Sequence, residues 1–392
     1  MPVRRDFVLV VALCSGIAPV AAGQGPSLVT RWAATVDTAH PLPEYPRPEL
    51  RRREWRNLNG PWDYAIRPAS DPLPAAFDGR IVVPFPVESQ LSGVRRSVRP
   101  TDALWYRRVM DARPAPGVRW LLHFGAVDWD ATVWVNGHAV GRHRGGYDPF
   151  TFDVTSALTA NGPQELVLRV TDPTDSGGQP RGKQVLGPGS IWYTAVTGIW
   201  QTVWLEPVPV VHVDGLEIVP DLVHSRVRVS VRAVGPVSAR AGVTIEAGDS
   251  VVARATIAVG RPAYVSISHP RTWSPDDPFL YHVRVTFGPD TVASQFGMRS
   301  IAIGRDADGI IRLLLNGRPL FEYGLLDQGW WPDGLYTAPT EAARLNDLVT
   351  IKALGFNLLR KHVKVEPARW YYDCDSLGIL VWQDMPSADN RT

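Results

Sequence analysis

The sequence predicts a multidomain protein in which two β-sandwiches precede an α/β segment. Residues 24–209 hold many short runs rich in Val, Trp, Tyr, Phe and Leu, separated by Gly, Pro, Asn and Asp. Residues 210–303 alternate apolar and polar positions with the period of two that strands show. After Gly304 strand-like and helix-like segments alternate, which indicates parallel β/α units.

Residues 1–22 are predicted to be a secretory signal peptide. Two arginines precede the apolar run "FVLVVAL", and small residues follow it. Cleavage after Ala22 fits this layout best, so we expect an exported protein, periplasmic or extracellular. A lipid anchor on Cys14 is the weaker alternative, because Leu13 stands where a small residue is expected.

The composition argues against several functional classes. A formal net charge of +2 over 392 residues gives no field that would attract nucleic acid. No later stretch approaches the roughly 20 apolar residues of a membrane-spanning helix, so no membrane partner is expected. Without the signal peptide Cys374 is the only cysteine. An intramolecular disulfide is therefore excluded, and large cores must stabilise the domains.

The first β-segment, residues 24–209, is predicted to be a sandwich with jelly-roll character. In "ATVWVNGHAVG" the pair Asn136-Gly137 lies between two alternating runs. This is a strong hairpin signal, since both turn residues must accept positive φ. The second β-segment, residues 210–303, spans 303 − 210 + 1 = 94 residues. That length suits an immunoglobulin-like sandwich of about 100 residues.

The third segment, residues 304–392, opens with a hairpin at Asn316-Gly317. Alternating strands and helices follow, which is the pattern of parallel β/α units. The strands are expected at 320–328, 356–363 and 379–385, and the helices at 340–355 and 367–378.

Seven motifs in order along the chain resemble glycoside hydrolase family 2, the β-galactosidase, β-glucuronidase and β-mannosidase family. They are "LNGPWDY" (58–64), "VPFPVESQLSG" (83–93), "LWYRR" (104–108), "VWVNGHAVGRHRGGYDPFTFDVT" (133–155), "TGIWQTVWLEP" (197–207), "WSPDDPFLY" (273–281) and "FGMRSI" (296–301). The resemblance covers nearly all of the chain after residue 22. It implies a galactose-binding-like jelly roll, an immunoglobulin-like sandwich and the start of a (β/α)8 TIM barrel, the catalytic domain of the family.

The resemblance also implies a reaction, the hydrolysis of terminal β-linked sugars with retention. Such chemistry needs two carboxyl groups roughly 5 Å apart, one as acid/base and one as nucleophile. In the family the acid/base follows an Asn after the fourth barrel strand, and the nucleophile lies on the seventh. No Asn-Glu pair occurs after Gly304. We therefore expect a chain truncated after the third barrel strand that lacks both catalytic glutamates and is inactive alone.

The resemblance places candidate sugar contacts at the exits of the strands expected at 356–363 and 379–385. His362 falls where the family has a histidine that hydrogen-bonds the sugar, and Arg360 belongs to the same motif. Lys364 replaces a proline of that motif, so a structural role for His362 stays open. Asp384 falls where relatives have an acidic residue, and we expect it to orient its neighbours.

Other candidates follow the first strand of the expected barrel. Asp327 leaves this strand beside Trp330 and Trp331. An indole face can stack on a sugar ring, and paired tryptophans are equally common in cores, so both interpretations stay open.

Three further motifs carry weaker signals. Ser190 to Trp192 stand where galactosidases of the family have an aspartate, so galactose specificity is not predicted. Tyr147 and Asp148 recur in the family motif, but Gly145-Gly146 favours a structural interpretation. Neither His138 and His143 nor Asp373 and Asp375 have a recognised metal-ligand spacing. No cofactor is expected, and a structural cation stays open.

The function expected from the resemblance is that of a β-glycosidase whose partner is an oligosaccharide or glycoside. An alternative from another class is a non-catalytic carbohydrate-binding protein built from the two sandwiches. A third is an adhesion or scaffold protein, which would bind no glycan. The sequence leaves the sugar, the linkage and the oligomeric state open.

Overall fold

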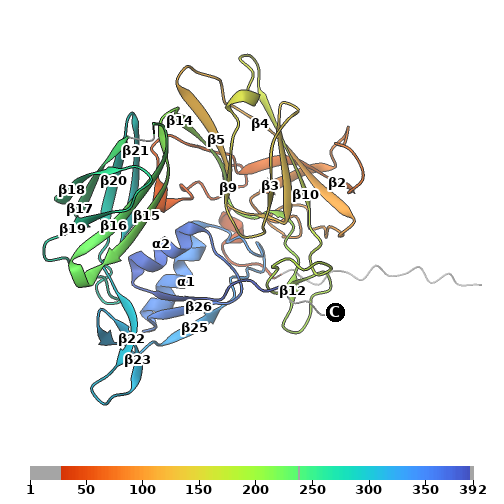
Figure 1. Cartoon of the computed structure of the whole chain (residues 1–392). Coiled ribbons are helices and arrows are strands. Elements are labelled where there is room, and N and C mark those ends of the chain that lie inside the picture. Colours follow the sequence, from red (N-terminus) through yellow and green to blue (C-terminus); the bar gives the residue numbers. More distant parts are fainter. Residues whose placement is uncertain (1–27, 237–238, 389–392) are drawn as a thin grey trace, which may run out of the picture.

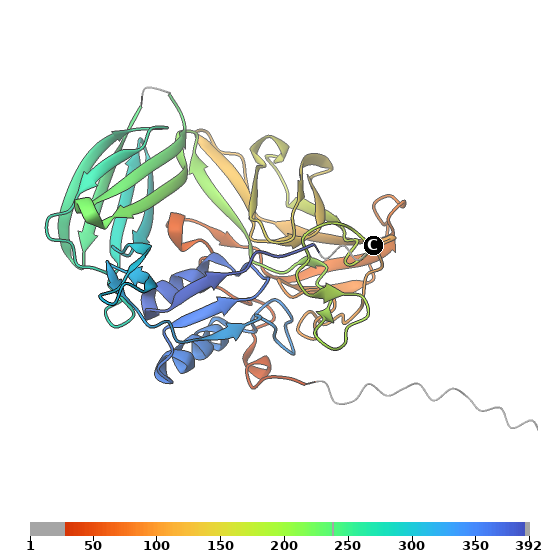
Figure 2. The same cartoon turned by 60° about the horizontal axis from the view of Figure 1, so that its bottom comes forward.

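The computed structural model describes residues 28–236 and 239–388. The predicted signal peptide therefore lies outside the described residues. Figure 1 shows three parts, with the first sandwich in orange to yellow, the second in green, and a blue α/β unit packed beneath both. In Figure 2 the α/β unit again lies against both sandwiches.

The first sandwich consists of two antiparallel sheets. The smaller sheet has the order β1 (Arg56–Asn57), β14 (Val203–Pro209), β5 (Val118–Phe124) and β9 (Phe150–Asp153). The larger has the order β3 (Gly79–Val83), β2 (Gly60–Pro68), β4 (Asp102–Met110), β10 (Gln164–Thr171), β7 (Asp130–Val135) and β8 (His138–Arg144). Two short pairs complete it, β6 (Val127–Asp128) with β13 (Gly198–Ile199) and β11 (Gln184–Val185) with β12 (Tyr193–Thr194). A short helix, η3 (Thr155–Ala157), follows β9.

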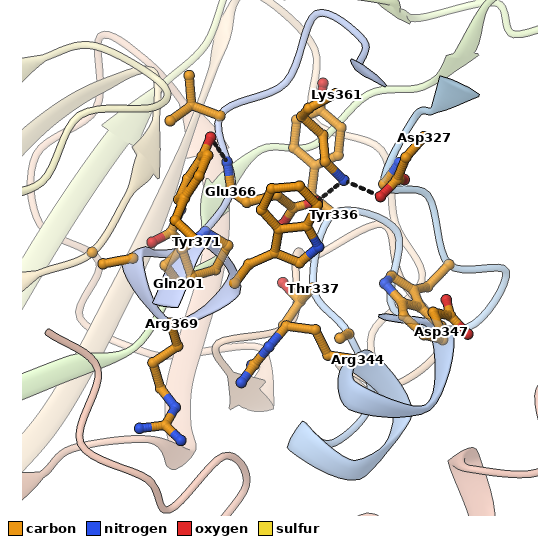
Figure 3. Close-up of a pocket in the computed structure, with 18 of the residues that line it drawn as sticks. Gln201, Asp327, Tyr336, Thr337, Arg344, Asp347, Lys361, Glu366, Arg369 and Tyr371 are labelled. Carbon is orange, nitrogen blue, oxygen red and sulfur yellow. Dashed lines mark hydrogen bonds and ion pairs between the residues drawn. The ribbon is translucent and has the colours of Figure 1, made fainter. Parts of the chain in front are cut away.

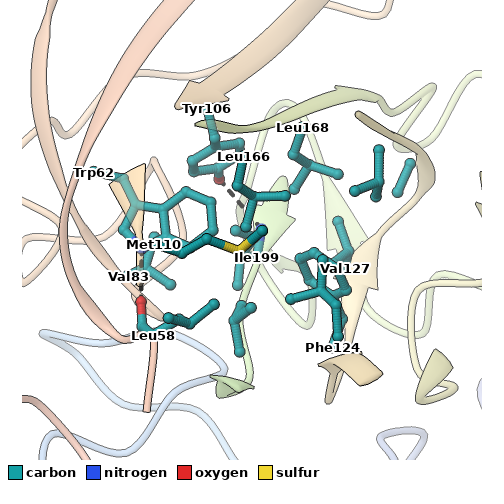
Figure 4. Close-up of a cluster of buried hydrophobic side chains, with 14 of the residues drawn as sticks. Leu58, Trp62, Val83, Tyr106, Met110, Phe124, Val127, Leu166, Leu168 and Ile199 are labelled. Carbon is teal, nitrogen blue, oxygen red and sulfur yellow. Dashed lines mark hydrogen bonds between the residues drawn. The ribbon is translucent and has the colours of Figure 1, made fainter. Parts of the chain in front are cut away.

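The core of this sandwich is made by inward-facing side chains of both sheets. Trp62, Tyr106 and Phe124 are fully buried in it, and Figure 4 shows the aromatic rings among aliphatic neighbours. The buried Tyr106 hydroxyl accepts a hydrogen bond from the Ile199 backbone N–H at 3.2 Å. This polar group is therefore satisfied as well as packed. The predicted Asn136-Gly137 turn is present, with φ values of 50° and 79°.

The second sandwich has an immunoglobulin-like arrangement of two sheets. One has the order β15 (His212–Asp221), β16 (Arg226–Val234) and β19 (Ala263–Ser266). The other has the order β18 (Ser250–Ala258), β17 (Arg240–Ala247), β20 (Tyr281–Phe287) and β21 (Asp290–Phe296). A short helix, η4 (Leu222–His224), joins β15 to β16. Side chains of β20 alternate strictly between buried and exposed, which is the period of two read in the sequence.

The third part begins with a hairpin sheet of β22 (Ile301–Arg305), β23 (Ile311–Leu315) and β24 (Arg318–Pro319). A three-stranded parallel sheet follows, in the order β25 (Gly324–Asp327), β26 (Leu358–Lys361) and β27 (Leu380–Gln383). Helices α1 (Glu341–Ala353) and α2 (Ala368–Leu377) connect its strands. The predicted fold class, two sandwiches and the start of a parallel barrel, is confirmed.

The first parallel strand is shorter than expected, because it begins at Gly324 rather than at residue 320. The side chain of Asn357 explains the late start. Its Oδ1 accepts a hydrogen bond from the Tyr323 N–H at 2.9 Å, and its Nδ2 donates to the Phe321 carbonyl at 2.9 Å. These backbone groups are therefore satisfied by a side chain instead of a neighbouring strand.

The helices begin and end where local chemistry dictates. Thr340 caps α1, because its Oγ1 accepts a hydrogen bond from the Ala343 N–H at 3.0 Å. Gly378 ends α2 with φ 74°, a left-handed conformation that favours glycine. The two helices cover one face of the parallel sheet, where Leu359 packs with Leu348 and Trp370.

An N-terminal segment, residues 30–52, runs between the other parts. It contains η1 (Ala33–Thr35) and η2 (Pro48–Leu50). Its Arg52 is 6% exposed and pairs with Glu206 of the first sandwich at 2.7 Å and Asp290 of the second at 2.9 Å. The segment therefore joins both sandwiches through a buried ion-pair cluster.

Candidate functional site

The register of the parallel sheet sorts the residues at its carboxyl edge onto two faces. Leu326, Arg360 and Trp382 stand side by side, and the next row consists of Asp327, Lys361 and Gln383. Successive side chains of a strand point to opposite faces. The two rows therefore face opposite sides, and the Asp327 row shares the face covered by α1 and α2.

Three of the predicted site residues meet on the face away from the helices. The Asp384 carboxylate accepts hydrogen bonds from Arg360 Nε at 3.0 Å and from His362 Nδ1 at 2.8 Å. The hydrogen bond from Arg360 lowers the pKa of Asp384, and His362 adds to this effect. About a quarter of the side-chain surface of His362 and of Asp384 is exposed, so a ligand can reach them.

This geometry fixes how His362 can bind a ligand. An ionised Asp384 keeps the proton of the neutral imidazole on Nδ1. Nε2 then carries a lone pair and can accept a hydrogen bond from a hydroxyl group. The cluster of Arg360, His362 and Asp384 can therefore orient a polyhydroxylated ligand at the carboxyl edge of the sheet.

The opposite face carries a buried charge network beneath this cluster. Lys361 Nζ lies 2.7 Å from Asp327 Oδ2 and 2.7 Å from Glu366 Oε1. Burial opposes its charge, but Glu366 and Asp327 prevail and raise the pKa of Lys361. Burial lowers the pKa of Lys364 to about 8, although Glu366 lies 2.9 Å away.

Lys364 ties two loops together. Its Nζ donates to the carbonyls of Gly329 at 2.7 Å and Tyr336 at 2.8 Å. The lysine that replaces the family's proline therefore holds the loop after β25 against the loop after β26. Because His362 lies between Lys361 and Lys364, this network also fixes the backbone that carries the histidine.

The two tryptophans of the loop after β25 have different surroundings. Trp330 stacks on Tyr193 with ring centroids 4.6 Å apart and contacts Tyr336 at 4.6 Å. Trp331 is half-buried and lines a cavity without a ring partner among the described residues. The sugar-stacking role expected for these residues stays a prediction.

A cavity of about 700 Å³ lies between the helix-covered face of the sheet and the first sandwich. Figure 3 shows Lys361, Asp327 and Glu366 at one end of it, with Arg344 and Arg369 further along. Asp327, Trp330 and Trp331 line this cavity, whereas Arg360, His362 and Asp384 do not. The six predicted contacts thus divide between an open cluster and a neighbouring cavity.

The motif residues of the first sandwich have structural contacts. The buried Tyr147 hydroxyl lies 3.0 Å from that of Tyr336, which joins the sandwich to the α/β unit. Gly146 leaves no room for a side chain, since a Cβ there would lie 2.6 Å from Asp128 Oδ1. Asp148 is exposed. In the loop between β11 and β12, Ile191 is 59% exposed.

Sequence reasoning missed a buried acidic group in the first sandwich. Asp128 accepts a hydrogen bond from Gln184, Asp172 from Thr174, and Glu88 from the Thr197 N–H. Burial raises the pKa of Glu88 to about 8 and that of Asp172 to about 6, and burial together with Asp172 raises that of Asp128. No local motif joins these three residues. Their only sequence signal is a carboxylate within or beside an apolar strand.

The two aspartates considered as metal ligands are accounted for by other contacts. Asp373 pairs with Arg344 at 2.9 Å, and Asp375 with Arg299 at 2.7 Å. Across residues 28–236 and 239–388, no group of three or more His, Cys, Asp and Glu side chains is placed to hold a metal ion. Among the helices of the same ranges, none combines the length and apolarity needed to cross a membrane.

Comparisons with known proteins agree with this architecture. Residues 211–299 match the family model "Glycosyl hydrolases family 2", and residues 94–190 match "Glycosyl hydrolase 2 galactose-binding domain-like". A β-galactosidase of Thermoanaerobacter pseudethanolicus is 26% identical over 304 residues, which are 72% of this chain and 39% of that protein. A β-galactosidase of Thermoanaerobacterium thermosulfurigenes is 24% identical over 68% of this chain and 38% of its own length.

Solved structures give the same result. The β-glucuronidase of Faecalibacterium prausnitzii superposes with a TM-score of 0.72 at 26% identity, over 88% of this chain and 61% of that one. The β-glucuronidase of Dictyoglomus thermophilum has a TM-score of 0.70 at 20% identity, which shows the shared fold. The chain spans less than two fifths of the length of the two β-galactosidases.

Two sandwiches followed by parallel strands are the architecture that the chain shares with these glycosidases. The chain belongs to glycoside hydrolase family 2.

Proposed function

We propose that the protein hydrolyses the glycosidic bond of a terminal β-linked sugar and that Arg360, His362 and Asp384 orient this sugar. The observation that carries the proposal is their cluster at the carboxyl edge of the parallel sheet, joined by hydrogen bonds of 2.8 and 3.0 Å. Barrel enzymes keep their functional residues at this edge. The β-galactosidases and β-glucuronidases to which the chain is similar support the reaction class.

The sugar-orienting role follows from the donors and acceptors of the cluster. His362 Nε2 can accept from one sugar hydroxyl, and free lone pairs of the Asp384 carboxylate can accept from another. Arg360 supplies a fixed positive charge, which keeps Asp384 ionised. Binding energy at the sugar hydroxyls positions the anomeric carbon for attack.

The bond-breaking step needs a second set of residues. Retaining hydrolysis requires an acid/base and a nucleophile. The 392 residues contain no Asn-Glu pair after Gly304, where the family's acid/base would be sought. We therefore propose that these residues by themselves bind sugar without turning it over.

The proposal is tested by the hydrolysis of aryl β-galactoside, β-glucuronide, β-mannoside and β-glucoside. A longer form of the chain that also carries both catalytic carboxylates, here called the full product, is expected to hydrolyse at least one of them, and residues 23–392 none. His362→Ala in the full product should lower kcat/KM about 10- to 100-fold, because it removes a hydrogen bond to the sugar and exposes Asp384.

A matched control exists in the second sandwich. Asp221 pairs there with His224 at 2.8 Å and Arg226 at 2.7 Å, which repeats the Arg-Asp-His arrangement away from the barrel. His224→Ala should leave kcat/KM unchanged.

Three outcomes would count against the proposal. If His362→Ala kept wild-type activity, His362 would not bind the sugar. Turnover by residues 23–392 that Asp384→Asn abolishes would contradict the proposed inactivity. Glycan binding without turnover by the full product would favour the carbohydrate-binding alternative.

We also propose that the protein is exported, on the strength of the arginine, apolar and small-residue pattern in residues 1–22. Mass spectrometry of the secreted protein should find an N-terminus near Gly23. Secreted protein that retains Met1 would contradict the cleavage.

A further inference from the structure

The cavity beside the candidate site is built differently from the open cluster of Arg360, His362 and Asp384. It lies on the other face of the parallel sheet, between α1, α2, the N-terminal segment and the first sandwich. Its volume of about 700 Å³ falls within the range of pockets that enclose small molecules. A ligand there would not touch the open cluster.

Two arginine side chains supply part of the cavity wall. Arg47 and Arg369 line the cavity, and terminal nitrogens of these side chains donate to Glu206 and to the Tyr45 carbonyl.

The cavity wall also offers acceptors, so its charges are nearly balanced. Glu44, Asp347 and Glu366 line it together with Arg344 and Lys361. Burial and the neighbouring Glu341 raise the pKa of Glu44 to about 7. At neutral pH its carboxyl group can therefore hold a proton and donate or accept a hydrogen bond.

Aromatic rings complete the wall. Trp331 lines the cavity half-buried, without a ring partner among the described residues. Trp370 and Tyr371 line it from α2. A flat aromatic face with donors and acceptors around it suits a ring that is apolar on its faces and hydroxylated at its edge.

From these features we infer that the cavity is a second carbohydrate-binding site, separate from the open cluster, which takes a neutral mono- or disaccharide. Sugar hydroxyls both donate and accept, which matches a wall that carries both cationic and carboxyl side chains. A strongly anionic ligand fits less well, because Glu44, Asp347 and Glu366 already balance the cationic side chains. The inference does not depend on hydrolysis and holds for an enzyme or a binding protein.

The test is isothermal titration of the purified chain with lactose, cellobiose and methyl β-D-galactopyranoside, with glucuronic acid as the anionic probe. At least one neutral probe should bind. Trp331→Ala should weaken its binding about tenfold or more, since a buried tryptophan contact often dominates a binding site. Ala338→Trp, which fills the cavity from its wall, should also weaken this binding.

Two controls separate this site from the proposed active site. Trp382 is 48% exposed on the other face of the sheet, so Trp382→Ala removes a tryptophan without touching the cavity. His362→Ala disrupts the open cluster. Trp382→Ala should bind the neutral probe as the wild type does. His362→Ala should keep the binding that Trp331→Ala removes, and it should lower hydrolysis by the full product.

One measurement needs no variant. In the wild-type chain, the bound sugar should slow hydrogen exchange in the loop of residues 328–338 and at the start of α2. The absence of binding by every neutral probe would overturn the inference. So would wild-type binding by both cavity variants, or loss of binding confined to His362→Ala. A preference for glucuronic acid over the neutral probes would overturn the ligand class.

Discussion

Three acidic side chains of the first sandwich, Glu88, Asp128 and Asp172, are kept from water by the folded structure. Glu88 Oε1 is buried without a partner, while Oε2 accepts from the Thr197 N–H at 3.0 Å. Burial raises the pKa of Glu88 to about 8. A group protonated in the folded state and ionised in the unfolded state makes folding pH-dependent.

The sign of this dependence follows from the raised pKa values. The folded state holds protons that the unfolded chain releases above its ordinary pKa of 4.5 for Glu88. The contribution of Glu88 to the free energy of unfolding is therefore complete below about pH 4.5 and declines as the pH rises toward 8. We expect the free energy of unfolding of the wild type to be about 1 to 3 kcal/mol lower at pH 8 than at pH 5. Glu88→Gln should flatten this slope. Urea unfolding at both pH values measures it, and an equal slope in the variant would contradict the assignment.

At the scale of residues, the sequence indicated which side chains lie at the carboxyl edge of the sheet. It indicated less well which of them contact one another. His362, Arg360 and Asp384 were expected at one edge, and the structure brings them together. Asp327 was expected beside them but turns to the helix-covered face. Alternation along a strand was readable, but which face α1 and α2 would cover depends on three-dimensional packing.

At the scale of elements, α2 depends on how it ends. Gly378 has φ 74°, and a Cβ there would fall against the carbonyl oxygen of Pro275. Gly378→Ala should therefore lower the free energy of unfolding by about 2 to 4 kcal/mol, from backbone strain and a steric clash together. Thermal and urea unfolding measure the loss.

The control for this change is Gly355, at the end of the other helix. Its φ is 87°, but a Cβ added there would meet no atom within 4 Å. Gly355→Ala should therefore show only the strain, about 1 kcal/mol. Equal losses at the two glycines would mean that the contact with Pro275 is unimportant.

The positions of the two helices could largely be predicted from the residues at their ends. Thr340, Pro367 and Gly378 mark helix boundaries in the sequence, and α1 and α2 lie between them. The first parallel strand was predicted too long, because the long-range hydrogen bonds of Asn357 to residues 321 and 323 leave no signal in that segment.

At the scale of the whole molecule, Arg52 joins three parts of the chain. Arg52 donates a hydrogen bond to the fully buried Glu206 at 2.7 Å and another to Asp290 at 2.9 Å. Burial alone would raise the pKa of Glu206, but His123, Arg47 and Arg52 hold it well below its usual range. No local pattern could have predicted this cluster, since Arg52 lies 154 and 238 residues from its two partners.

Removing Arg52 should destabilise the protein strongly. Arg52→Met would leave Asp290 and Glu206 buried with fewer partners, and losing one member of a buried ion pair lowers the free energy of unfolding by about 3 to 5 kcal/mol. Arg228→Met is the control, because Arg228 pairs with Glu217 on the surface at 2.8 Å. Calorimetry should show a large decrease in Tm for Arg52→Met and almost none for Arg228→Met. Similar Tm values for the two variants would contradict a stabilising role of the buried cluster.

The N-terminal segment also sets an order of events in time. Thr30 donates to Asp333 through its N–H at 2.9 Å and its hydroxyl at 2.6 Å, a partner 303 residues later. At ribosomal rates of about 5 to 20 residues per second, about 15 to 60 s separate the synthesis of the two residues. Both sandwiches emerge within this interval and can fold while residue 30 still lacks its partner. The segment around Thr30, made before both sandwiches, is therefore among the last described parts of the chain to reach its final place.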